Sequence, residues 1–297
     1  MINFRYHVVS IIGIFVALAV GVVLGAGPLQ TRIRAGVSSS GATTTVDPAA
    51  SAHAEAEAAG LKALASSTLA GSLAGRQVAL VLLPGASEDD VSAIRSTLTD
   101  AGASVVGRVS LTDNWESTSM SQYRTTLSAT LASHLSSGGA KTASADGIVG
   151  YAIAQVLSST GAETDLLRQI LTDQSTPIMT VDEDPAGGAS TLVAIGARAQ
   201  AQPQATASPS AVSKSSDAWA GLAQAVGSTS GVVVGDASSR DAMITYLRGS
   251  ATGVTTVDSV GTTLAAVDTA LALAHGGSGA RAFGVGNGAQ SVVPSTK

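Results

Sequence analysis

The longest uncharged stretch of the chain lies near its N-terminal end. Residues 8–29 carry no charged side chain, and Ser10 is the only clearly polar residue among these 22. As a helix, the stretch is about 33 Å long, which matches the roughly 30 Å hydrocarbon core of a bilayer. Phe4 and Tyr6 precede it, where aromatic rings favour the membrane interface. The pattern predicts a single transmembrane helix; a buried helix of a soluble protein is the alternative.

A cleaved signal peptide is a further alternative for this segment. Its apolar run is longer than the roughly 7–15 residues of a signal peptide. The best cleavage site, at residues 25–27, would leave Pro28 at the new terminus, which peptidases disfavour. We therefore expect a retained anchor. Charge does not decide its orientation, because Arg5 with the terminal amine nearly balances Arg32 and Arg34.

Small residues recur at every fourth position of the predicted anchor, at Gly13, Ala17, Gly21 and Gly25. This spacing places them on one helix face, and its last two members form a GxxxG motif. Such a face lets two helices approach closely, which favours dimerisation. Glycine and alanine are also common in membrane helices without a packing role, so both interpretations stay open.

The segment after the anchor changes composition twice. Residues 36–51 are rich in Ser, Thr and Gly, which predicts a flexible spacer. Asp47 and Pro48 suit an N-cap and a first-turn proline, so we expect an Ala-rich helix from there to about Leu73. Its apolar face is thin, which predicts a stalk or a helix that packs against another copy.

A short, continuous apolar run, Val78 to Leu83, ends at Pro84. Such a run is typical of a parallel strand that is buried on both faces. Helical spacing follows over residues 88–101, with Gly102 as its cap, and residues 104–111 form the next predicted strand. We therefore predict a parallel β-α-β unit.

A second unit of this kind follows 151 residues later. Asp90 and Asp241 are among the positions that coincide at this offset. We interpret the two units as related halves, although any β-α-β unit places small and capping residues in a similar way. The second unit has a strand at 232–235, a helix at 239–247 and a strand at 254–257.

The fold class predicted from this alternation is α/β, with a layered, mostly parallel sheet behind the anchor. Further helices are expected at 121–136, 146–158, 162–173, 218–226 and 262–275, and further strands at 177–181 and 191–195. The expected domains are 1–35 (anchor and flanks), 36–74 (spacer and helix) and 75–297 (α/β domain, with halves 75–198 and 215–297 joined by a disordered loop at 199–214).

Composition narrows the function. The chain is 45% hydrophobic but only 3% aromatic, so its core consists of aliphatic side chains. From Asp47 onward there are 13 basic and 21 acidic residues. This part of the chain is therefore acidic, whereas a nucleic-acid-binding protein usually has an excess of basic residues. The absence of cysteine excludes disulfides, thiol catalysis and iron–sulfur clusters.

No catalytic motif is present. The four histidines, His7, His53, His134 and His275, form no HxH, HExxH or i,i+4 pair, and neither GxSxG nor SxxK occurs. The glycines between 284 and 288 resemble a phosphate-binding loop only superficially, since no helix is expected after them; we predict a tight turn. The sequence therefore predicts neither an enzyme nor a bound cofactor.

Two acidic clusters, 88–90 and 182–184, carry the oxygen ligands that suit Ca²⁺ or Mg²⁺. Acidic residues at a helix start more often interact with the helix dipole, and acidic residues after a strand more often form a solvated loop. Asp182 is the better candidate, because ligands bind at the carboxyl ends of strands. We assign no metal site. A copper site is not recognisable either, since Met1, Met120, Met179 and Met243 are scattered along the chain.

Several segments, spread over most of the chain, share the pattern of one known family: residues 1–10, 15–25, 82–86, 110–115, 255–260 and the tail up to Pro294. In these segments the chain resembles the actinobacterial copper transporter MctB family. The resemblance implies an envelope protein of an actinobacterium, linked to copper homeostasis, described as an outer-membrane channel component, and without catalytic residues. The chain departs from the family at residues 48–73, which are Ala-rich and short where members often carry a charged, heptad-like helix.

The leading hypothesis is an MctB-like envelope protein with a role in copper transport or homeostasis. Its membrane anchor would hold the α/β domain on the periplasmic or cell-envelope side, where it works by assembly or by contact with a partner. The expected partners are the membrane, further copies and other envelope proteins, with copper ions left open as a ligand. The alternative is an envelope scaffold with only an indirect link to copper; an α/β enzyme with a non-standard site is a third hypothesis.

Overall fold

The computed structural model describes residues 48–185, 187–199, 213–275 and 281–295. Its internal contacts divide the chain into a unit that ends at Glu55 and a unit that begins at Ala56. Of the first unit, only the start of helix α3 (Pro48–Leu69) is described. The predicted anchor at 8–29 lies outside the described residues. Within the described ranges, no helix is both long and apolar enough to cross a bilayer.

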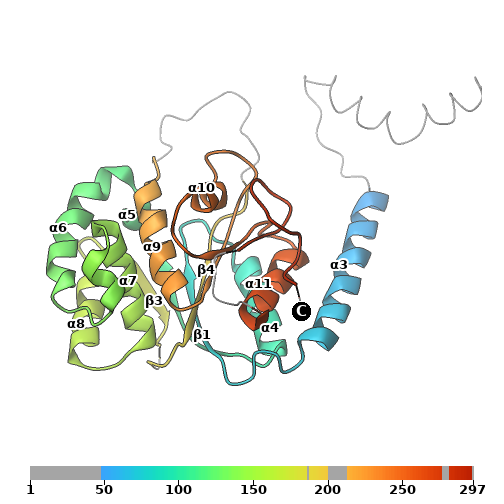
Figure 1. Cartoon of the computed structure of the whole chain (residues 1–297), viewed down its shortest axis with the longest axis horizontal. Coiled ribbons are helices and arrows are strands. Elements are labelled where there is room, and N and C mark those ends of the chain that lie inside the picture. The colour runs from blue at the N-terminus through green and yellow to red at the C-terminus, as the bar shows by residue number, and fades with distance from the viewer. Residues whose placement is uncertain (1–47, 186, 200–212, 276–280, 296–297) are drawn as a thin grey trace, which may run out of the picture. The chain divides into compact units, whose positions relative to one another are not determined.

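The second unit contains a seven-stranded sheet with the order β3-β2-β1-β4-β5-β6-β7 (Figure 1). The edge strand β3 runs antiparallel to β2, and every other neighbouring pair is parallel. The predicted mixed α/β class with a mostly parallel sheet is confirmed. The strands are β1 (Gln77–Leu82), β2 (Ser104–Leu111), β3 (Met179–Glu183), β4 (Thr191–Ile195), β5 (Val232–Val234), β6 (Thr255–Val257) and β7 (Ala282–Phe283).

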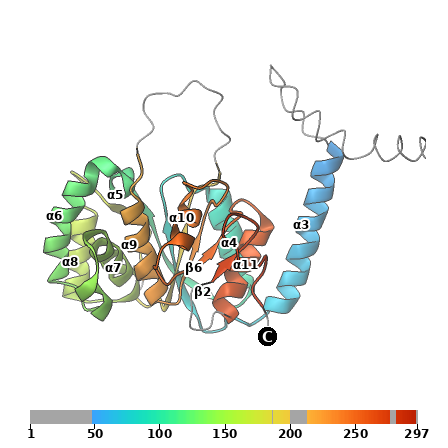
Figure 2. The same cartoon turned by 45° about the horizontal axis from the view of Figure 1, so that its top comes forward.

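Helices cover both faces of this sheet, so that the second unit has three layers (Figures 1 and 2). One layer contains α4 (Glu88–Asp100), α11 (Thr263–His275) and the end of α3. The other contains α5 (Asp113–Glu116), α6 (Ser121–Ala132), α7 (Ala145–Ser158), α8 (Ala162–Leu171), α9 (Ser216–Ser228) and α10 (Met243–Gly249).

Strand β1 shows why its sequence is continuously apolar. Ala79 and Val81 pack into the hydrophobic cluster on one face, whereas Val78, Leu80 and Leu82 pack into the cluster on the other. Side chains alternate between the two faces of a strand, and helices cover both faces here, so no position of β1 after Gln77 tolerates a polar residue.

Helix α3 ends earlier than predicted and packs differently. It stops at Leu69 instead of Leu73, and a turn follows. Ala65 and Leu69 are buried against the same cluster as α4 and α11, with Leu61 packed beside them. The prediction of a stalk or of packing against another copy is therefore wrong for these last turns, which pack against the chain's own α/β unit.

Two other boundaries shift for local reasons. Helix α10 begins at Met243 and not at 239, because the preceding residues form a turn in which the amide of Ile244 donates to the carbonyl of Asp236 at 3.0 Å. Strand β3 covers 179–183 and not 177–181, so Asp182 lies within the strand and not beyond its end. The two β-α-β units belong to one sheet, with α4 and α10 on opposite faces; their kinship stays a prediction.

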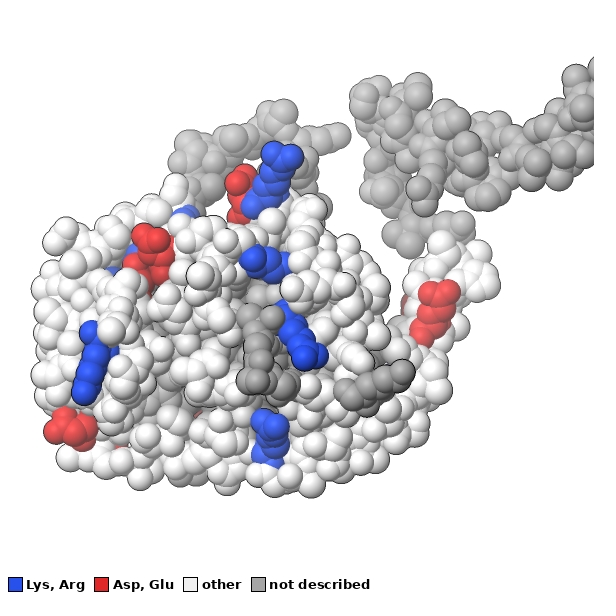
Figure 3. Space-filling view, viewed as in Figure 1, with Lys and Arg blue, Asp and Glu red and all other residues white. Residues whose placement is uncertain are grey.

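Charged side chains are sparse on this domain, since they make up 12% of the chain. On the face shown in Figure 3 they lie singly or in small groups among neutral residues. A continuous charged tract therefore does not mark a binding surface on this face.

Candidate functional site

The carboxyl ends of four parallel strands, β1, β4, β5 and β6, lie side by side at one edge of the sheet. Leu82 of β1 pairs with Ile195 of β4, which pairs with Val234 of β5, which in turn pairs with Val257 of β6. The chain builds outward from β1 in one direction through β2 and in the other through β4, so the strand order reverses between β1 and β4. In open α/β sheets, ligands bind in the crevice outside the carboxyl ends of the strands at this point.

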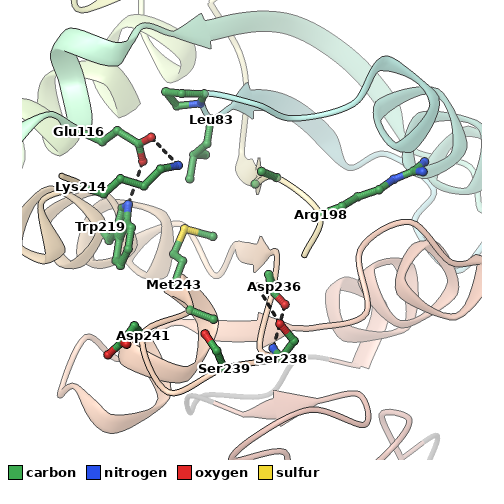
Figure 4. A pocket seen from close by; sticks show the side chains of 14 residues that line it. Leu83, Glu116, Arg198, Lys214, Trp219, Asp236, Ser238, Ser239, Asp241 and Met243 are labelled. Carbon is green, nitrogen blue, oxygen red and sulfur yellow. Dashed lines mark hydrogen bonds and ion pairs between the residues drawn. The ribbon is translucent and has the colours of Figure 1, made fainter. Parts of the chain in front are cut away.

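A crevice of about 410 Å³ lies at this position (Figure 4). Leu83 follows β1, Arg198 follows β4 and Asp236 follows β5, and the wall is completed by α5, α9 and α10. Leu83, Pro84, Trp219 and Met243 contribute apolar surface, and five charged side chains line the same crevice: Glu116, Arg198, Lys214, Asp236 and Asp241. The site therefore combines an apolar floor with charged groups of both signs.

Glu116 is a buried charge at the wall of this crevice. Only 6% of its side chain is exposed. One carboxylate oxygen accepts the indole N–H of Trp219 at 3.0 Å, and the other lies 2.7 Å from the ammonium of Lys214. Because both oxygens have a charged or polar partner, the cost of burying the carboxylate is offset, and three elements are tied together at one point.

The backbone around Glu116 is fixed from behind by Arg124 of α6. This guanidinium is fully buried; Nη1 donates to the carbonyl of Ser117 at 2.7 Å, and Nε donates to Asp146 at 2.5 Å. A buried charge with these partners holds α5, α6 and α7 in register. The carboxylate of Glu116 therefore projects from a rigid base.

The segment before α9 brings Lys214 to the site. Lys214 forms an antiparallel bridge with Ser117, and the amide of Thr118 donates to the carbonyl of Ser213 at 2.9 Å. The sequence predicted disorder up to residue 214, which is wrong for Ser213 and Lys214. Residues 200–212 of that predicted loop lie outside the described part of the chain.

Arg198 and Asp236 occupy other parts of the wall. Arg198 donates two hydrogen bonds to the buried carboxylate of Asp90 in α4, at 2.7 and 2.8 Å. Asp236 accepts the amide and the hydroxyl of Ser238 at 2.8 and 3.0 Å. Asp90 thus links the start of α4 to the loop after β4, while the carboxylate of Asp236 bonds within its own loop among the described residues.

A second hollow of about 230 Å³ adjoins the crevice, because Asp236 and Ser238 line both. At its base, the buried carboxylate of Asp258 accepts the amides of Val285 and Gly286 at 2.9 and 2.8 Å. Burial alone would raise the pKa of Asp258, but these bonds, together with those from Ser259 and Arg248, hold it below its ordinary value. The glycine-rich segment forms a turn held by a carboxylate, in agreement with the tight turn predicted there.

One comparison with known proteins decides the family. The family described as "Copper transport outer membrane protein, MctB" matches residues 1–294. The chain belongs to the MctB family. The resemblance found in the sequence is thereby confirmed over the whole chain, including the segment predicted as the anchor. Among curated proteins, none matches the chain.

The acidic clusters of this MctB family member bind arginines. Arg108 of β2 lies 2.6 Å from Glu88 and 3.1 Å from Asp182, which joins one cluster to the other. Arg95 of α4 forms a bidentate pair with Glu183. The hydrogen bonds from Arg95 lower the pKa of Glu183. These ion pairs fasten the antiparallel edge strand β3 to α4. They give the acidic side chains a structural role that needs no metal ion.

The histidines and methionines of the MctB chain lie on separate elements. His134 contacts Glu163 at 2.5 Å, Met179 is fully buried in β3, and Met243 lines the crevice. His53 and His275 lie in α3 and at the end of α11. Within the described ranges, no three His, Asp or Glu side chains converge as a metal site would need. The predicted helix-packing face, Gly13, Ala17, Gly21 and Gly25, lies outside the described residues.

The crevice residues themselves were missed by sequence reasoning. Glu116 and Trp219 carry no motif, and their partnership depends on the packing of α5 against α9. The signal that was available is positional: Leu83, Arg198 and Asp236 each come within three residues of a predicted buried strand end. At a switch point such residues meet, but the sequence does not give the strand order that places the switch point.

Proposed function

We propose that this protein is a membrane-anchored member of the cell envelope that takes part in copper transport or homeostasis by contact with partners, not by catalysis. The observation that carries the proposal is the match of the MctB family to residues 1–294. This range includes residues 8–29, whose uncharged length suits a bilayer.

A binding role is supported by the chemistry of the crevice. Its described lining contains Ser238 and Ser239 but no histidine, and the hydroxyl of Ser238 is engaged by Asp236 of the same loop. Two of its charged groups, Glu116 and Lys214, form an ion pair with each other. Such fixed polar groups suit recognition of a ligand or partner.

The cellular test measures copper in a strain from which the gene is deleted. Grown with added copper, the strain should retain more cell-associated copper than its parent, and the full-length gene should restore the parental amount. A version lacking residues 8–29 should fail to restore it, because the domain is no longer held at the membrane. If the deletion strain retained the same amount of copper as its parent, the proposed role in copper transport would be contradicted.

The second candidate is an envelope scaffold whose link to copper is indirect. It is favoured by one observation: the part of the chain that the structure describes holds no cluster of three His, Asp or Glu side chains that could bind a metal ion. Under this alternative, the deletion strain has normal copper content but altered envelope integrity, which sensitivity to detergent would report. The same strain therefore separates the two candidates.

A further inference from the structure

The crevice between β1 and β4 offers opposite charges and apolar surface to a single ligand. The geometry points to a small zwitterion, an amino acid or a short peptide, as that ligand. Its carboxylate is bound by Lys214, its ammonium by Asp236 or Asp241, and its apolar part lies against Leu83 and Met243. This inference goes beyond the role in copper transport and does not rest on it.

The ammonium of Lys214 is positioned before any ligand arrives. The bridge to Ser117 fixes its backbone, and Glu116 holds the ammonium at 2.7 Å. An ammonium group has three donor hydrogens, and Glu116 is the one ion-pair partner of Lys214 among the described residues. The side chain lines the crevice and is 46% exposed. The ammonium of Lys214 is therefore already held in place when a ligand carboxylate arrives. Binding then loses less side-chain conformational entropy, which favours affinity.

The loop after β5 supplies the negative charges. Asp236 is held by the amide and hydroxyl of Ser238, and Asp241 is exposed in the same loop and lines the same crevice. Within the described ranges, neither carboxylate has a Lys, Arg or His side chain within ion-pair distance. In Figure 4, Lys214 and Asp236 lie on different sides of the crevice, with Met243 between them. A ligand ammonium supplies the cation that these carboxylates lack.

Phosphorylated ligands fit this site poorly. In a dinucleotide-binding sheet, the pyrophosphate sits at the start of the helix that follows the first strand. Here that helix is α4, and its first turn carries Glu88, Asp89 and Asp90. Asp90 also accepts two hydrogen bonds from Arg198, through Nε and Nη2. Like charges repel a multiply charged anion, whereas a zwitterion carries no net charge.

The volume of the crevice and its apolar side chains also suit such a ligand. A volume of about 410 Å³ lies within the range of roughly 300–1,000 Å³ that is usual for small-molecule sites. Leu83, Pro84, Met243 and the indole of Trp219 supply apolar contacts. This combination suits an aliphatic side chain, and it leaves room for a second residue.

The test uses full-length protein purified in detergent and two zwitterionic probes, L-leucine and the dipeptide Leu-Leu. Binding is followed by calorimetry and by tryptophan fluorescence, because Trp219 lines the crevice while Trp115 is fully buried. We expect saturable binding of at least one probe. The N-acetyl form lacks the ammonium and the amide form lacks the carboxylate. Each should bind at least about tenfold more weakly, as expected for the loss of one charge-assisted hydrogen bond.

Two variants test which residue binds the carboxylate of the ligand and which binds its ammonium. Lys214→Met should abolish the preference for the free carboxylate over the amide, and Asp236→Asn should reduce the preference for the free amine over the N-acetyl form. Lys141→Met and Asp165→Asn remove the same charges at exposed positions away from the crevice and should change neither preference. The proposal is overturned if neither zwitterion binds at millimolar concentration, or if the blocked forms bind the unaltered protein equally well.

Discussion

Arg248 and Asp258 form an ion pair at 2.9 Å in which both side chains are buried. The guanidinium of Arg248 also donates to the carbonyls of Phe283 and Asn287, at 2.7 and 2.8 Å. One pair therefore fastens the end of β6, helix α10 and the C-terminal glycine-rich segment to each other. This segment closes the sheet beyond β7, since Phe283 bridges to Ser291.

Breaking this pair should destabilise the fold strongly. Asp258→Asn or Arg248→Met leaves one buried charge unpaired, which costs about 3–5 kcal/mol. Chemical unfolding followed by circular dichroism measures the loss. Glu88→Gln is the matched control, because it removes a pair with Arg108 in which Glu88 is 66% exposed, and it should cost at most about 1 kcal/mol. Equal losses in the two cases would contradict the structural role of the buried pair.

Asp268 of α11 should make stability depend on pH. It is fully buried, and neither of its carboxylate oxygens has a hydrogen-bond partner among the described residues. Burial, and to a lesser extent the charge of Asp258, raises its pKa to about 7. An acid whose pKa is higher in the folded state favours folding when protonated, so the free energy of unfolding should fall as the pH rises from about 4 to about 7.

Asp268→Asn should remove this dependence. The variant should be about 1–3 kcal/mol more stable than the parent protein near pH 8, where the parent buries an unpaired charge, and about equal to it near pH 4. Urea unfolding at both pH values measures the difference. Asp165→Asn, an exposed change, serves as the control and should show no such divergence. Stabilisation of equal size at both pH values would mean that the charge of Asp268 is not the cause.

The sequence predicts much of this fold because its strands are buried on both faces. Runs such as Val78 to Leu83 leave no alternative to a central strand, and Thr191 to Ile195 is found at its predicted bounds. The antiparallel direction of β3 was not predicted, since pairing with β2 depends on contacts such as Arg108 with Asp182 that join distant parts of the chain. The order of the strands is likewise a property of long-range pairing.

The candidate site was less predictable for a related reason. Lys214 stands in a stretch whose composition is typical of disorder, and it is held by its bridge to Ser117 and its ion pair with Glu116. Glu116 gains its partners when α9 packs beside α5. Local composition and periodicity cannot report either contact, because the residues involved are about a hundred positions apart.

Gly284 is a position where only glycine fits. Its φ angle is +121°, and an added Cβ would overlap the carboxylate of Asp258. Gly284→Ala should therefore cost about 2–3 kcal/mol. Gly138→Ala is the control, because a Cβ there meets no atom within 4 Å. Thermal unfolding compares the two variants, and a Gly284→Ala protein as stable as its control would show that the glycine-rich segment is not held as described.

The orientation of the chain should place the α/β domain outside the cytoplasm. Charge around residues 8–29 does not decide the orientation, so this expectation rests on membership of the MctB family. A reporter enzyme that is active only after export, fused after Lys297, should be active. A reporter that works only in the cytoplasm, fused at the same point, is the control. If the second reporter were active and the first inactive, the α/β domain would lie in the cytoplasm and the prediction would be wrong.

The α/β domain should not bind copper tightly on its own. The soft or imidazole ligands after residue 46 are His53, His134 and His275 with Met120, Met179 and Met243. A selective copper site needs several such ligands within bonding distance of one ion. Met179 is fully buried in the core and offers no donor at the surface, and His134 contacts Glu163 through Nδ1, outside the elements that carry the other donors. Copper would then be passed through weak contacts or through a partner.

Calorimetric titration of residues 46–297 with Cu(II), and with Cu(I) under reducing conditions, tests this expectation. We expect no one-to-one isotherm tighter than about micromolar, because isolated donors on separate elements bind a metal only weakly. His275→Gln and Met243→Leu each remove a donor and should leave the weak signal unchanged. A tight isotherm that either replacement abolishes would demonstrate a copper site built by the fold, and it would favour direct transport over the scaffold alternative.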